Sequence, residues 1–71
     1  MRTSKQSYRD YFRDMYHYVK ITVILKEHGE QYNNLSKFIK SRHYDHYLSL
    51  EKLQLYEQWI NQTLENLHNI H

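Results

Sequence analysis

The stretch from residue 49 to residue 69, SLEKLQLYEQWINQTLENLHN, is the clearest amphipathic segment of the chain. Its apolar residues recur every three or four positions, the spacing of one face of an α-helix: Leu50, Leu53, Tyr56, Ile60, Leu64 and Leu67. Ser49 is a favourable helix cap, and Glu51 places a negative charge in the first turn, where the helix dipole is positive. The stretch predicts a long C-terminal helix over residues 49–69.

A second run of helical spacing precedes it, after residues 1–6, which we expect to be disordered. Its apolar positions also step by three and four: Tyr8, Tyr11, Phe12, Met15, Tyr18, Val19 and residues 22–25. Gly29 follows a polar last turn, and glycine is the residue that most often ends a helix in a left-handed conformation. We therefore predict a first helix over residues 7–29.

Part of this run also fits a β-strand. Val19, Ile21, Val23 and Leu25 alternate with other residues between 18 and 25, and β-branched side chains dominate. The length of the helical pattern before it and the glycine after it favour the helix.

A short second helix is predicted over residues 34–42, with Asn33 or Asn34 as its cap. Leu35, Phe38 and Ile39 would share its apolar face. The chain is thus predicted to be a single all-α domain, residues 1–71, of three to four helices.

The apolar face of the C-terminal helix is broad, and Trp59 widens it. A chain of 71 residues buries a thin core, and without cysteine it has no disulfide to support that core. We therefore expect a homodimer or a protein partner to cover this face, unless the first helix covers it in a three-helix core. The predicted protein interface is Leu53, Tyr56, Trp59, Ile60, Leu64 and Leu67.

Charge is unevenly distributed. Residues 1–20 hold five basic and two acidic side chains, a net charge of +3, whereas residues 47–71 hold one base and three acids, a net charge of −2. Between residues 37 and 46, Asp45 is the single acid among several basic residues. Basic regions at the N-terminus and in the middle suit a protein that presents one face to a polyanion.

Several classes of protein are not expected. The chain has no glycine-rich phosphate loop, no nucleophile motif and little room for a catalytic pocket, so we expect neither an enzyme nor a cofactor. His43 and His46, like His68 and His71, are spaced as zinc ligands could be, but surface histidines explain the pattern and we expect no metal. No signal peptide or membrane span is apparent, and the lack of cysteine fits a reducing compartment, so we expect a cytoplasmic protein.

The order of a helix, a glycine, a short helix, a polar turn and a longer helix resembles the small, degenerate helix-turn-helix regulators of Gram-positive phages and mobile elements. The resemblance covers residues 18–64 and rests on Leu35-Ser36-x-x-Ile39, where that family usually has Leu-Ala-x-x-Leu/Ile in the helix before the turn. The chain departs from the family at Lys40, where a glycine normally makes the turn. The lack of alanine and proline and the abundance of asparagine, lysine, isoleucine and tyrosine are typical of an AT-rich genome.

The resemblance implies transcriptional regulation by a dimer that acts on operator DNA or on another regulator. Lys37, Lys40 and Arg42 would neutralise phosphates of duplex DNA. The residues that would lie near base edges in the major groove are Arg42, His43, Tyr44 and His46.

Two alternatives stay open. If residues 18–25 form a strand, the chain is similar to ribbon-helix-helix repressors, in which Lys20, Thr22 and Ile24 would face the bases. The other alternative is a protein-only binder, such as an antirepressor, an anti-CRISPR or other inhibitor, or a capsid scaffold. Such a protein would dock onto a repressor or another host or phage protein through the aromatic face of its C-terminal helix, because aromatic residues are common at the centres of interfaces.

Overall fold

The computed structural model describes residues 4–69, and this part of the chain is all-helical, as predicted. It contains no strand, so the strand predicted as an alternative over residues 18–25 is wrong for the described chain. The four α-helices and one 3-10 helix are α1 (Lys5–Met15), α2 (Ile21–Glu27), α3 (Asn33–Lys40), η1 (Arg42–Tyr47) and α4 (Leu50–Asn69).

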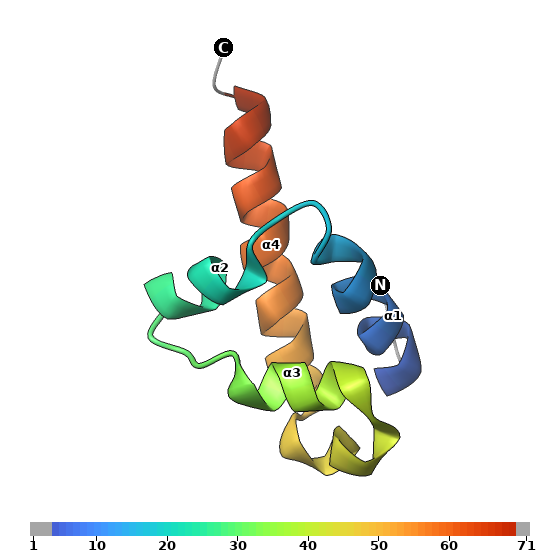
Figure 1. The fold of residues 1–71 in the computed structure, drawn as a ribbon. Helices are drawn as coiled ribbons and strands as arrows, with labels where there is room; N and C mark the ends of the chain where they lie inside the picture. The colour runs from blue at the N-terminus through green and yellow to red at the C-terminus, as the bar shows by residue number, and fades with distance from the viewer. Residues whose placement is uncertain (1–3, 70–71) are drawn as a thin grey trace.

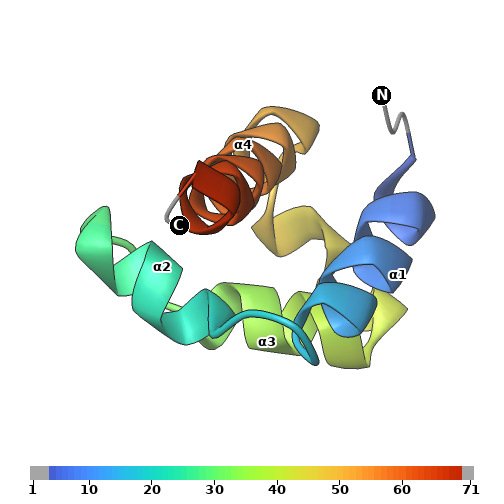
Figure 2. The ribbon, with the colours of Figure 1, turned by 90° about the horizontal axis from the view of Figure 1, so that it is seen from above.

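The predicted first helix over residues 7–29 is divided in two. α1 ends at Met15, where the amide of Tyr18 donates to the carbonyl of Met15 at 2.9 Å and tightens the last turn. α2 begins at Ile21. Phe12 of α1 and Tyr56 of α4 are in ring contact, with centroids 6.4 Å apart, and α2 packs on α4. The break lets the two helices lie at either flank of α4, which a straight helix of this length could not do (Figure 2).

The start of α1 corrects a second prediction. Lys5 and Gln6, expected to be disordered, lie in the first turn of α1, and residues 1–3 lie outside the described chain. The side-chain oxygen of Ser4 accepts a hydrogen bond from the amide of Ser7 at 3.2 Å, which caps the helix.

Gly29 ends α2 in the left-handed conformation predicted for it, with φ at +76°. The amide of Glu30 donates to the carbonyl of Leu25 at 2.8 Å, the bond that characterises a glycine-capped helix end. The chain reverses here and leads into α3.

The three short α-helices surround one side of α4, with α1 and α2 at its flanks and α3 crossing between them (Figures 1 and 2). α2 packs on α4, and α3 packs on α1 and η1. The last turns of α4 extend beyond the rest of the fold (Figure 1).

The core contains Tyr8, Tyr11, Phe12, Ile21, Ile24, Leu25, Leu35, Phe38, Leu48, Leu53, Tyr56 and Ile60. No helix in the described chain has the length and apolar character needed to cross a membrane.

The apolar face of α4 is mostly part of this core. Leu53 and Ile60 are fully buried and Tyr56 is 3% exposed, so the prediction that they form an exposed interface is wrong. Trp59 and Leu64 are partly buried against the core. Only Leu67, with 59% of its surface exposed, remains open among the six predicted interface residues. The short helices cover the rest of the stripe.

Candidate nucleic-acid interface

α3 has one buried face and one exposed polar face. Leu35 and Phe38 are fully buried in the core. Its exposed side chains are Asn33, Asn34, Lys37 and Lys40. Asn33 and Asn34 were expected to cap the helix, but the cap position is Tyr32, which makes no side-chain capping bond. The amides of both asparagines are therefore exposed on the first turn of α3.

η1 follows α3 at once and carries most of the other predicted DNA-binding residues. Ser41 caps it by accepting a hydrogen bond from the amide of His43 at 3.2 Å. The rings of Tyr44 and Tyr47 lie 5.2 Å apart, and the ammonium of Lys37 lies 5.9 Å from the first ring and 5.7 Å from the second. These contacts place a lysine of α3 over two aromatic rings of η1.

An ion pair between Arg9 of α1 and Asp45 of η1 holds this arrangement in place. Arg9 is 5% exposed, its Nε donates to the carbonyl of Phe38 at 2.8 Å, and its guanidinium lies 4.7 Å from the Phe38 ring. Lys5 also donates to the carbonyl of Asp45, at 2.8 Å. Burial lowers the pKa of Arg9, and the positive charge of nearby Arg42 lowers it further. These contacts join α1, α3 and η1.

The second acid near α3, Glu30, is also paired. Its carboxylate forms an ion pair with Lys52 of α4 and accepts a hydrogen bond from the hydroxyl of Tyr56 at 3.3 Å. The hydrogen bond from Lys52 holds the pKa of Glu30 below its ordinary value. Burial raises the pKa of Tyr56 to about 12, and the negative charge of Glu30 adds to this effect.

The electrostatic result is a positive surface around α3. Glu30 and Asp45 are the two acids between residues 28 and 48, and both have a basic partner from another helix. Lys37, Lys40 and Arg42 are exposed in the same segment. Arg42 donates from Nε to the neutral side chain of Gln6 at 3.1 Å, and no acid of the described residues forms an ion pair with it.

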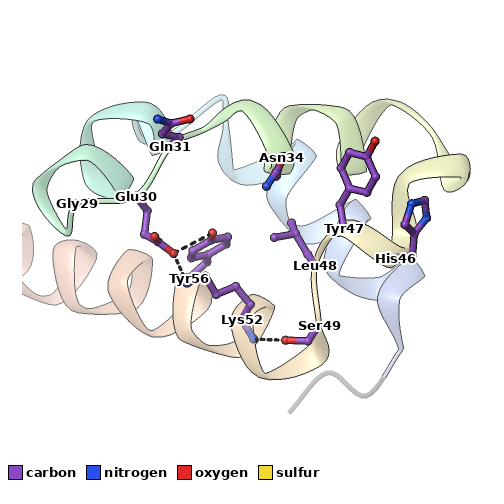
Figure 3. A pocket seen from close by; sticks show the side chains of 10 residues that line it. All are labelled: Gly29, Glu30, Gln31, Asn34, His46, Tyr47, Leu48, Ser49, Lys52 and Tyr56. Carbon is purple, nitrogen blue, oxygen red and sulfur yellow. Dashed lines mark hydrogen bonds and ion pairs between the residues drawn. The ribbon is translucent and has the colours of Figure 1, made fainter.

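A polar groove of about 720 Å³ lies beside α3, where the loop after α2, the end of η1 and the start of α4 meet (Figure 3). Asn34 and His46 reach it from one side, and the Glu30–Lys52–Tyr56 cluster closes the other side (Figure 3). The groove therefore joins Asn34 of α3 and His46 of η1 in one polar surface.

The six predicted DNA-binding residues lie on two adjoining elements. α3 carries Lys37 and Lys40, and η1 carries the other four: Arg42, His43, Tyr44 and His46. All are exposed except Tyr44, which is partly buried. Arg9, Asn33 and Asn34 were not among the site residues predicted from the sequence. For Arg9, the one available signal was that Asp45 is the single acid in a basic segment.

His43 and His46, which are spaced as zinc ligands could be, contact aromatic rings in the described chain. The rings of His43 and His46 contact Tyr44 and Tyr47, with centroids 5.3 and 4.6 Å apart. Within residues 4–67, no group of three or more histidine and acidic side chains is placed to hold a metal ion. His71 and the side chain of His68 lie outside the described part.

Comparisons with protein families, with curated proteins and with solved structures found no match to this chain.

Proposed function

We propose that this protein is a small DNA-binding regulator whose α3 helix enters the major groove of duplex DNA. The proposal places the helix-turn-helix one helix earlier than the sequence resemblance did: α2 is the first helix, Gly29 makes the turn, and α3 is the recognition helix. Gly29 supplies the left-handed residue that Lys40 could not supply. The prediction that the turn lies at Lys40 is therefore replaced.

The observation that carries the proposal is the uncompensated positive charge beside the exposed face of α3. Lys37, Lys40 and Arg42 are exposed, while the neighbouring acids Glu30 and Asp45 are neutralised by Lys52 and Arg9. Lysine and arginine at such a surface bind phosphates and give affinity without sequence preference.

The first turn of α3 offers groups that can read bases. In helix-turn-helix proteins the N-terminal residues of the second helix contact base edges. Asn33 and Asn34 are exposed there, and an asparagine amide can form two hydrogen bonds with adenine in the major groove. We assign base reading to these two residues and phosphate binding to Lys37 and Lys40.

η1 has a different role from the one the resemblance implied. It is a six-residue 3-10 helix joined to α1 through Asp45, and such a short element does not offer the several turns of a recognition helix. We assign Arg42 and His43 to the sugar-phosphate backbone beside α3.

The alternative of a protein-only binder keeps only part of its predicted surface, since Leu67 is exposed and Trp59 and Leu64 are partly buried. Leu53, Tyr56 and Ile60 fill the core, so they cannot dock onto another protein while the chain stays folded. The observations favour DNA.

The test is a titration of labelled duplex DNA with single variants. Lys37→Ala and Lys40→Ala should each weaken binding to every sequence by about tenfold, the range of one charge-assisted contact. Lys26→Ala removes an exposed lysine from α2 and serves as the matched control, since it should change binding by less than about threefold. Equal effects of all three substitutions would contradict the assignment of α3.

A further inference from the structure

A second surface lies apart from α3 and η1, at the edge of the core next to Ile24. α2 and the C-terminal half of α4 form a groove of about 280 Å³. Tyr18, Val23 and Leu67 line this α2–α4 groove, and 77%, 47% and 59% of their surfaces are exposed. The remaining lining residues are Val19, Lys20, Ile24, Glu27 and Thr63. Exposed aromatic and aliphatic side chains gathered in one groove mark a contact surface.

The charges at this groove have a pattern that points to its occupant. Lys20 lies at the start of α2 and Glu27 at its end, and Val23 lies between them. All three side chains are exposed, and within the described residues neither charged group belongs to an ion pair. The surface of α2 therefore runs from a positive end through an apolar centre to a negative end.

Such a surface is complementary to itself. A two-fold axis through its centre places the same helix antiparallel, so that each Lys20 meets the Glu27 of the other copy and the two Val23 side chains meet at the axis. Tyr18 and Leu67 would then be covered by the second copy. A partner other than a second copy would need its own surface with a negative, an apolar and a positive part in matching order.

We propose that the α2–α4 groove binds a second copy of this chain, with α2 packed antiparallel against its two-fold mate. This interface goes beyond the proposed function and does not depend on it, because the residues assigned to DNA lie on α3 and η1. It also replaces the predicted dimer surface on α4, of which only Leu67 is open.

The decisive experiment is a charge-reversal cycle, with the dimer dissociation constant measured by analytical ultracentrifugation. In the antiparallel pair, Lys20→Glu alone places two acids together at both ends of the interface, and Glu27→Lys alone places two bases together. Each should weaken the dimer by about tenfold or more, since two attractive contacts become repulsive. The double variant Lys20→Glu/Glu27→Lys restores opposite charges and should return the constant to within about threefold of the original value.

The cycle separates the interface from an effect inside one chain. An acid at the start of α2 and a base at its end both suit the helix dipole, so each single variant should preserve or raise the melting temperature of the monomer, measured at a protein concentration below the dimer dissociation constant. A weaker dimer from a single variant whose monomer is at least as stable as the original then comes from contact between copies.

A second pair of variants tests the apolar centre. Val23→Asp should disrupt the dimer, whereas Leu55→Asp, at an exposed leucine of α4 outside the groove, should leave it intact. Circular dichroism should show that both variants remain helical. A protein that stays monomeric up to millimolar concentration, a dimer that tolerates Val23→Asp, or a double variant that fails to recover would each overturn the proposal. Loss of DNA binding by Lys37→Ala without loss of the dimer would keep the two proposals distinct.

Discussion

Arg9 and Asp45 form an ion pair between residues 36 positions apart in the sequence, and the pair joins the first α-helix to the 3-10 helix. The side chain of Arg9 is 6% exposed and that of Asp45 is 34% exposed. The same arginine donates to the backbone carbonyl of Phe38 at 2.8 Å. One buried guanidinium therefore positions both α3 and η1, the two elements of the proposed DNA surface.

We predict that Asp45→Ala lowers the free energy of unfolding by about 2–3 kcal/mol, because it leaves Arg9 as a buried charge without its counter-ion. Asp10→Ala is the control, since the Asp10–Arg13 pair is about half exposed and should contribute less than about 1 kcal/mol. Urea unfolding followed by circular dichroism measures both. Similar losses from the two substitutions would show that the Arg9–Asp45 pair has no special role.

Gly29 is the residue at which backbone conformation limits substitution. Its φ is +76°, and an added Cβ would meet no atom within 4 Å, so any cost comes from the backbone alone. Gly29→Ala should lower the free energy of unfolding by about 1 kcal/mol. Gly29→Asn should cost less, because asparagine adopts this conformation more readily. A thermal melt in which alanine is tolerated better than asparagine would contradict this explanation.

Ile60 and Leu67 lie on the same stripe of α4 but differ in burial. Ile60 is fully buried, so Ile60→Ala should cost about 2–4 kcal/mol through lost contacts and a cavity. Leu67→Ala should cost less than about 0.5 kcal/mol in a monomer, because its side chain is exposed. Chemical unfolding at low protein concentration distinguishes them. An Ile60→Ala variant of unchanged stability would restore the view of this stripe as an external interface.

Glu30 should make the free energy of unfolding depend on pH in the acidic range. Its pKa is lowered in the folded state by Lys52, so the charged carboxylate adds stability above its ordinary pKa of about 4.3, and this contribution is lost as the pH falls through the lowered value. The loss should stay below about 1 kcal/mol because both side chains are partly exposed. Glu30→Gln should therefore lose less stability than the original chain between pH 5 and pH 3, a range about one unit either side of the ordinary value. Lys52→Gln should have the same effect, and an unchanged acid dependence in either variant would refute the coupling.

The sequence predicted the elements whose signals are local. The helix expected over 49–69 is α4 at Leu50–Asn69, the one expected over 34–42 is α3 at Asn33–Lys40, and Gly29 ends a helix as expected. In each case spacing, a cap or a glycine lies within a few residues of the boundary. These features depend on nearby residues, and the sequence displays them directly.

The features that the sequence did not predict depend on distant contacts. Helical spacing continues across residues 16–20, so it does not mark the break between α1, which packs on α3, and α2, which packs on α4. The burial of Tyr56 and Ile60 depends on how the other helices cover α4. The position of Arg9 depends on Asp45 and Phe38, far along the chain.

The measurement that tests the central claim most directly is fluorescence anisotropy of a labelled random DNA duplex, titrated with the protein at about 50 and 200 mM salt, where phosphate-driven binding weakens sharply. If Lys37, Lys40 and Arg42 each contact one phosphate, the affinity should fall by about fortyfold per chain between these two conditions. Binding that is absent at the lower salt concentration, or that is unchanged at the higher one, would contradict the assignment of α3 and its neighbours as a DNA-binding surface.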